Sequence, residues 1–154
     1  MLNHLLSWAI WLPIFAGIIV AVIGSNGARA NIARWVALFG AIASFLVTLP
    51  LFSGFDRLNG GMQFTELASW IPALGLNYHL GVDGISVLFV ILNAFTTVLV
   101  VLAGWQVIQK KPAQYFAAFL IMSGLINGAF SALDAILFYA FFEGMLIPMY
   151  LIIG

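Results

Sequence analysis

Five apolar stretches, each long enough to cross a bilayer as a helix of about 20 residues, restrict what this chain of 154 residues can fold into. The chain is 64% hydrophobic and only 6% charged, so it has too few charges to cover a globular surface in water. The sequence therefore predicts an all-α, polytopic membrane protein with five transmembrane helices in a single membrane domain, residues 1–154. The expected helices are 5–23, 32–52, 84–107, 113–133 and 135–154.

The composition excludes several classes of function. The formal net charge is zero, which argues against binding to nucleic acid. The chain has no cysteine, so its own residues can form no disulfide, thiolate zinc site or iron–sulfur site. There is no glycine-rich phosphate-binding motif, and the two histidines, His4 and His79, are too far apart in the sequence for metal-ligand spacing. We therefore expect no cofactor in this chain and a lipid bilayer around it.

The basic residues predict the orientation, because cytoplasmic loops carry an excess of Lys and Arg. The first and third loops would share one side of the membrane, with Arg29 and Arg34 flanking the first loop and Lys110 and Lys111 in the third. The linker, residues 53–83, holds only Arg57, so we expect the linker and the N-terminus outside and the C-terminal end inside. In the linker, the alternating "LNYHL" at 76–80 is compatible with a short hairpin. The first apolar stretch begins without Lys or Arg and is too long for a signal peptide, so we expect no cleavage.

Two aspartates precede apolar stretches, at the position where a carboxylate caps the first turn of a helix. They are Asp83 and Asp134, and we interpret both as N-caps. Asp134 is expected at the outer surface, so it is also a secondary candidate for proton exit.

A polar stripe runs along the fourth stretch. Ser123, Asn127 and Ser131 recur at steps of four, which places them on one helix face, and Gly124 and Gly128 lie beside them. Small residues four apart let helix backbones approach closely in membranes. This face is expected to meet protein or water. A packing seam is the plain interpretation, and Ser123 is a candidate site residue. In the third stretch, Asn93, Thr96 and Thr97 are expected to hydrogen-bond between helices.

The fifth stretch contains one carboxylate, Glu143, near its middle. It follows Asp134 by nine residues, or about 13–14 Å of helix, close to half of a ~30 Å hydrocarbon core. All Lys and Arg lie in the loops or beside them, so none reaches that depth. A carboxylate so placed can take up and release protons, and charged residues inside membrane segments are functional by default. The alternative is a neutral glutamate that hydrogen-bonds to another helix.

The neighbours of Glu143 can also be predicted. Tyr139 and Tyr150, four residues before and seven after, lie on its helix face, and Tyr139 is a further candidate site residue. If the last two stretches form a hairpin, residues equidistant from the turn share a depth. Glu143 would then lie level with Ser123 and Gly124 and face the polar stripe.

Two segments resemble a known family: "YHLGVDGISVLF" at 78–89 and "FFEGMLIPMYLIIG" at 141–154. They are similar to the N-terminal third of the chain M family, the antiporter-like, proton-pumping membrane subunits of NADH–quinone oxidoreductase, respiratory complex I. The resemblance implies the start of an antiporter-like inverted-repeat fold. It also implies that Glu143 belongs to the proton path and pairs with a lysine on a later helix. That lysine is absent from these 154 residues, so we expect the chain to be an N-terminal fragment.

The same resemblance implies a function, partners and a location. The chain would be one membrane-arm subunit among others, coupling electron transfer from NADH to quinone to proton translocation. Flavin, iron–sulfur clusters and quinone would belong to partner subunits, with no redox site here. The expected location is a bacterial inner (plasma) membrane, with the mitochondrial inner membrane as the alternative. Two other functions stay open: a related cation/proton antiporter subunit, and a structural membrane fragment without transport.

Overall fold

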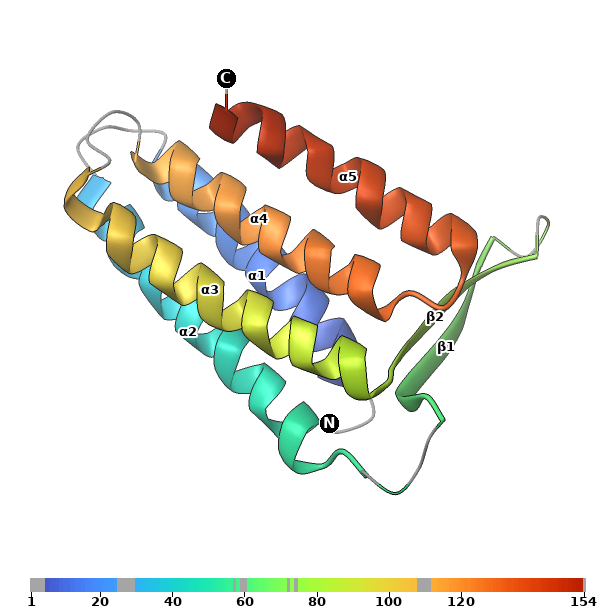
Figure 1. Cartoon of the computed structure of the whole chain (residues 1–154). Coiled ribbons are helices and arrows are strands. Elements are labelled where there is room, and N and C mark those ends of the chain that lie inside the picture. Colours follow the sequence, from blue (N-terminus) through green and yellow to red (C-terminus); the bar gives the residue numbers. More distant parts are fainter. Residues whose placement is uncertain are drawn as a thin grey trace.

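The computed structural model describes residues 5–24, 30–56, 58, 61–71, 73, 75–107 and 112–153, and its main feature is a set of long helices packed side by side (Figure 1). They are α1 (Leu5–Ile23), α2 (Ala30–Ser53), α3 (Gly84–Val107), α4 (Pro112–Ser131) and α5 (Ala135–Ile153). All five are long and apolar enough to cross a membrane, which confirms the predicted helical membrane fold. The bounds of α1 and α3 are those expected, and α2 is longer by two residues at its start and one at its end.

The end of α4 differs from the expectation. The helix stops at Ser131, two residues before the predicted end at 133, because the chain there turns to pair with a strand. Ala132 forms an isolated antiparallel bridge with Leu80, and the Leu133 N–H donates to the His79 carbonyl at 2.8 Å. The short connection between α4 and α5 is therefore fixed to the linker by backbone hydrogen bonding.

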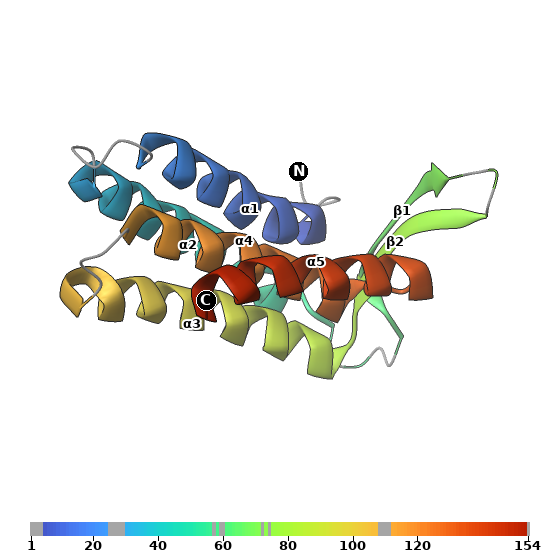
Figure 2. The same ribbon diagram turned by 90° about the horizontal axis from the view of Figure 1, so that it is seen from above.

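The linker folds into an antiparallel hairpin of β1 (Gln63–Ile71) and β2 (Leu76–Val82). The hairpin indicated by "LNYHL" is present and is longer than that segment alone, and the position of its first strand, β1, was not predicted. Gly75, with φ +70°, lies in the turn, where glycine adopts a positive φ without steric cost. The hairpin projects from the end of the bundle at which α1, α3 and α5 begin (Figures 1 and 2).

Helix α4 is the centre of the arrangement, because it packs against α1, α2, α3 and α5. Helix α5 lies at the edge of the bundle, with α4 and β2 as its main neighbours (Figure 1). A helix at the edge keeps much of its circumference uncovered by the other described elements.

Two glycines set the close approach of α1 and α4. A Cβ on Gly124 would lie 2.3 Å from the Ile10 carbonyl oxygen, and a Cβ on Gly17 would lie 2.8 Å from the Ala117 carbonyl oxygen. Both distances are too short for a side chain, so the expected close contact at Gly124 is confirmed. Gly128, one turn further along α4, instead faces α5, and a Cβ on it would lie 2.7 Å from the Phe141 ring. Gly124 therefore contacts α1 and Gly128 contacts α5, so these two glycines do not form one seam.

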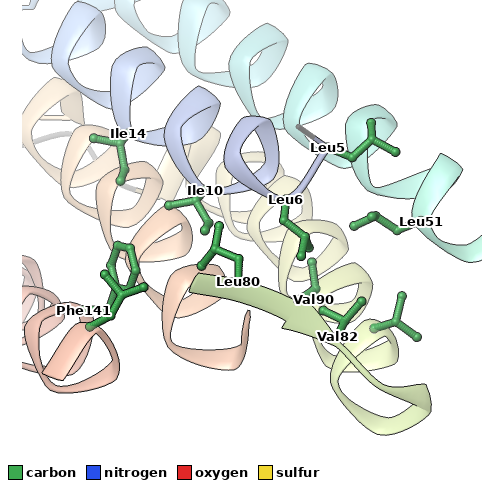
Figure 3. Packing of buried hydrophobic residues seen from close by; sticks show 11 residues of the cluster. Leu5, Leu6, Ile10, Ile14, Leu51, Leu80, Val82, Val90 and Phe141 are labelled. Carbon is green, nitrogen blue, oxygen red and sulfur yellow. The ribbon is translucent and has the colours of Figure 1, made fainter. Parts of the chain in front are cut away.

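The buried apolar side chains form two clusters. One, here called the hairpin-end cluster, joins α1, α2, α3 and α5 to strand β2 (Figure 3). Its members are Leu5, Leu6, Ile10, Ile14, Leu51, Leu80, Val82, Val87, Val90, Leu137 and Phe141. The other contains residues of α1, α2, α3 and α4, with Phe116 among the alanines Ala33, Ala37, Ala41, Ala113 and Ala117. The hairpin is therefore part of the core at its end of the bundle.

Candidate functional site: the carboxylate of helix α5

Glu143 lies near the middle of α5. Eight residues separate it from Ala135 and ten from Ile153, which correspond to about 12 Å and about 15 Å of helix. A Cβ on the adjacent Gly144 would lie 3.6 Å from the methyl groups of Leu125 on α4. Glu143 is therefore level with the middle of α4, close to the depth expected from reflection about the turn.

The Glu143 side chain is exposed on the outer face of the bundle. Tyr139 and Tyr150 share this face and are 61% and 74% exposed. No described residue donates a hydrogen bond to the Glu143 carboxylate. The described part of the chain therefore neither pairs with this carboxylate nor covers it. Thus Tyr139 is on the expected face, and the uncovered side of α5 carries a carboxylate between two tyrosines.

Glu143 does not face the polar stripe of α4, so that prediction is wrong. The symmetry of a helical hairpin sets the depth of a residue but not the rotation of the helix about its axis. Helix α5 buries Leu137, Phe141 and Pro148. At about 100° per residue, Glu143 lies roughly 200° around the helix from Phe141, and so points away from α4.

The polar stripe holds α1, α3 and α4 together. Thr97 Oγ1 lies 2.9 Å from Ser123 Oγ, and Asn93 Nδ2 donates to the Ser123 carbonyl and to Asn127 Oδ1, both at 2.9 Å. Asn127 Nδ2 donates to the Ala9 carbonyl of α1 at 3.0 Å. The prediction of interhelical hydrogen bonds is confirmed for Asn93 and Thr97. Thr96, which was predicted with them, is exposed.

Ser123 is therefore not brought together with Glu143 in this structure. Its side chain is buried, and it forms hydrogen bonds with Asn93 and Thr97 of α3. The candidate role of Ser123 in proton transfer stays a prediction, while its role in helix packing follows from these contacts.

Both predicted helix caps are present. Asp83 Oδ1 accepts from the N–H groups of Ser86 at 2.8 Å and Ile85 at 3.1 Å. Asp134 Oδ1 accepts from the Ile136 N–H at 2.9 Å. The hydrogen bonds from Ser86 hold the pKa of Asp83 below its ordinary value of 3.8, because they stabilise the ionised carboxylate.

A second carboxylate was missed by the sequence analysis. Glu66 of β1 is buried, and it accepts from the Ser7 N–H at 3.0 Å and from Ser7 Oγ at 2.5 Å. The Tyr78 hydroxyl lies 3.1 Å from Ser7 Oγ and accepts from Trp11 Nε1 at 3.0 Å. Burial raises the pKa of Tyr78 above its ordinary value of 10.0, because the phenolate loses hydration. Within "QFTEL", nothing local marks Glu66 as an inward-facing residue.

Some residues named in the sequence analysis lie outside the described ranges. They are His4, Arg29, Arg57, Lys110 and Lys111. The predicted orientation depends largely on these residues, so it stays a prediction.

The five apolar helices and the mid-depth carboxylate define the chain as a polytopic, α-helical membrane protein with one intramembrane acid. A family model described as "NADH-ubiquinone oxidoreductase chain 4, amino terminus" matches residues 8–131. The chain therefore belongs to this family. The expectation drawn from the two resembling segments is confirmed.

Individual relatives agree with this assignment. The chain is 48% identical to NADH-quinone oxidoreductase subunit M of Rhodobacter capsulatus, over 99% of this chain and 30% of the relative. It is 39% identical to NADH-ubiquinone oxidoreductase chain 4 of Arabidopsis thaliana, over 97% of this chain and 30% of the relative. Among solved structures, respiratory complex I from Thermus thermophilus with bound NADH matches with a TM-score of 0.74 and 30% identity, over 96% of this chain and 27% of the matched one. The chain thus spans about 30% of the length of the curated relatives it matches.

Proposed function

We propose that this chain forms the N-terminal part of a proton-translocating membrane-arm subunit of NADH–quinone oxidoreductase, with Glu143 as a proton-carrying group. The observation that carries the proposal is a carboxylate at mid-depth of a membrane helix, in a chain of this family. Acidic residues inside membrane segments are rare and mark proton or ion pathways.

The exposed face of α5 supports the proposal. A charged side chain that met lipid at this depth would cost about 2.5–3.5 kcal/mol on insertion scales, and more on an isolated helix in simulations. The face with Glu143, Tyr139 and Tyr150 is therefore expected to be covered by protein or water. The relatives are long enough to supply further helices, since the chain matches only 30% of their length.

The roles of the named residues follow from their positions. Glu143 would bind and release the proton, and a basic partner from outside this chain would set its charge. Tyr139, one turn before it, would offer a hydroxyl to the same proton path. Asp134 would act mainly as the cap of α5, with proton exit as a secondary role, and Ser123 would act through helix packing.

The partners and location belong to the same proposal. Other membrane-arm subunits would surround the chain, and NADH oxidation by flavin and iron–sulfur clusters, with quinone reduction, would take place in partner subunits. The membrane would be a bacterial inner (plasma) membrane, with the mitochondrial inner membrane as the alternative.

The test replaces Glu143 in a protein that carries this segment at the full length of its relatives. Glu143→Gln keeps the size and hydrogen-bonding capacity but removes the exchangeable charge, so the complex should assemble while proton pumping and coupled quinone reduction fall severely. Glu143→Asp should keep part of the activity, because the carboxylate survives on a shorter stem. Proton uptake and electron-transfer rate are measured in membrane vesicles and normalised to the assembled complex.

Asp134→Asn is the matched control, since it removes a charge from the start of the same helix. It should have a milder effect, because an N-cap contributes only about 0.5–2 kcal/mol of helix stability. Near-normal pumping by Glu143→Gln would refute the proton-carrying role and favour a structural glutamate.

A further inference from the structure

Three helices begin at the hairpin end of the bundle, and each has a carboxylate at its first turn. Asp83 caps α3, Asp134 caps α5, and Glu66 binds the first turn of α1. Asp83 and Asp134 directly precede their helices, whereas Glu66 lies on a strand, 59 residues after its partner Ser7. The contact between the hairpin and α1 is therefore a tertiary contact, between residues far apart in the sequence.

The Glu66 side chain is buried, and both of its carboxylate oxygens contact one residue of α1. Its carboxylate receives both the N–H and the hydroxyl of Ser7, the third described residue of α1. N–H groups in the first turn of a helix have no carbonyl within the helix to bond, and the helix dipole favours a negative charge at this end. Tyr78 of β2 and Trp11 of α1 complete the group through hydrogen bonds to the Tyr78 hydroxyl. Both strands of the hairpin are thereby held to α1.

The same hairpin determines where α5 begins. The His79 carbonyl accepts from Leu133 N–H at 2.8 Å, and Leu80 forms the bridge with Ala132. These contacts lie just before Ala135, the first residue of α5. Strand β2 is thus bonded to the segment that leads into the helix of Glu143.

Leu80 links the hairpin to the helices by packing as well. It is fully buried and belongs to the hairpin-end cluster, which also contains Ile10 of α1 and Phe141 of α5 (Figure 3). Phe141 is two residues before Glu143, and its ring fills the space that Gly128 leaves on α4. A shift of the hairpin relative to α1 would therefore reach α5 through the hairpin-end cluster and through the His79–Leu133 hydrogen bond.

We propose that Glu66 is a positioning residue for Glu143: by binding the first turn of α1 it fixes the hairpin, and the hairpin fixes the start, and so the depth, of α5. This inference rests on the proposed function of Glu143. It assigns to the linker hairpin a task inside its own chain, which is to hold a peripheral helix at a set height against the bundle. Helix α5 needs such a hold, because α4 and β2 are its main neighbours among the described elements.

The experiment measures the depth of α5 directly, without depending on pumping. A spin label is attached at Ile136→Cys, an exposed position in the first turn of α5, in the reconstituted full-length protein. A second label at Phe39→Cys, exposed on α2 and 12 residues before Leu51, the member of the hairpin-end cluster on that helix, reports on a region away from the hairpin. Depth is obtained from relaxation of each label by oxygen, which enters lipid, and by a water-soluble nickel chelate.

Glu66→Gln should shift the depth of the Ile136 label and leave that of the Phe39 label unchanged, and proton pumping should fall with the shift. Glu66→Asp, which keeps the charge, should restore part of the wild-type depth. Leu67→Gln is the matched control, because Leu67 is the next residue of β1 and is exposed, and it should change neither label. If Glu66→Gln is not recovered in folded form, Ser7→Ala, which removes the hydroxyl contacts to Glu66 and Tyr78 but keeps the Ser7 N–H contact to Glu66, should give a smaller shift of the same kind.

If the Ile136 label keeps its wild-type depth in Glu66→Gln, the inference is overturned. The same result in Ser7→Ala decides the question when Glu66→Gln does not fold. An equal shift of both labels would overturn it too, because it would show general loosening. Neither result depends on Glu143, whose role is tested separately by the pumping of Glu143→Gln.

Discussion

The close contact of α1 and α4 at Gly124 gives a quantitative prediction for Gly124→Ala. The new Cβ would lie 2.3 Å from the Ile10 carbonyl oxygen, whereas ordinary contact begins at 3.4 Å, so α1 and α4 must separate by about 1.1 Å. That separation would stretch the Asn127–Ala9 hydrogen bond from 3.0 Å beyond bonding distance. Because the clashing atom is backbone, a change of side-chain rotamer cannot relieve it.

Three contributions set the size of the effect. Overpacking costs about 1–3 kcal/mol, and loss of an interhelical hydrogen bond in a membrane costs about 0.6 kcal/mol. Alanine is favoured over glycine in a helix by about 1 kcal/mol, which acts in the opposite direction. The expected net loss of unfolding free energy is therefore roughly 0.5–2.5 kcal/mol.

The assay is reversible unfolding of the full-length protein in detergent micelles, with Gly144→Ala as the matched control. A Cβ on Gly144 would lie 3.6 Å from the Leu125 methyl groups, an ordinary contact with a flexible side chain. This control should therefore gain up to about 1 kcal/mol from helix propensity alone. Gly124→Leu and Gly128→Leu should disturb assembly. If Gly124→Ala proves as stable as Gly144→Ala, the close approach of α1 and α4 at Gly124 is wrong.

Further predictions concern the hairpin side and the orientation. Leu58→Cys, in the linker, should react with a membrane-impermeant thiol reagent from outside intact cells, and Asn31→Cys only from the cytoplasmic side; the reverse pattern would overturn the orientation. Since the pKa of Asp83 is lowered in the folded state, the ionised Asp83 carboxylate should stabilise the fold at pH values above 3.8, its ordinary pKa. This stabilisation should be lost as the pH falls through the lower pKa of the folded state, and Asp83→Asn should remove this pH dependence of unfolding. Since the pKa of Tyr78 is raised, its hydroxyl contacts should persist up to its ordinary value of 10.0 and be lost as the pH rises through the higher folded-state value; Tyr78→Phe should abolish the corresponding change in phenolate absorbance.

The helices could be predicted because a membrane span leaves a strong and local pattern. Apolar length alone predicted the bounds of α1 and α3, and the residues Asp83 and Asp134 marked the starts of α3 and α5. The end of α4 was wrong by two residues, because a tertiary contact decides it. Ala132 and Leu133 are apolar enough to continue a helix, and the pairing with β2 prevents this.

The depth of Glu143 could be predicted, but the direction of its side chain could not. Depth follows from residue count along α5, which is a local quantity. Rotation follows from which side chains α5 buries against α4 and β2, and a helix that is apolar around most of its circumference gives little indication of that. The polar stripe of α4 was correctly expected to meet protein, but its partners proved to be α1 and α3.

Glu66 shows the limit of reasoning from alternation in a strand. A pattern of alternating polar and apolar residues places acids on the solvent side, and Leu67, the apolar neighbour, would be expected inside. The structure has the reverse, with Glu66 buried and Leu67 exposed. The cause is the first turn of α1, whose free N–H groups and dipole make the buried carboxylate favourable. Such a contact joins positions 59 residues apart, so it leaves no local trace in the sequence.

The two sides of α4 make different contacts. On one side, Ser123 and Asn127 are joined by direct hydrogen bonds to α3 and α1. On the other side, Gly128 receives Phe141, and that contact turns Glu143 outward. If Glu143 carries the proton as proposed, its direct contact with Ser123 or Asn127 would require a rotation of α5 that removes Phe141 from its place at Gly128. It follows from the proposed function that the proton path lies on the uncovered side of α5, and that α1, α3 and α4 serve as the fixed support against which this helix is held.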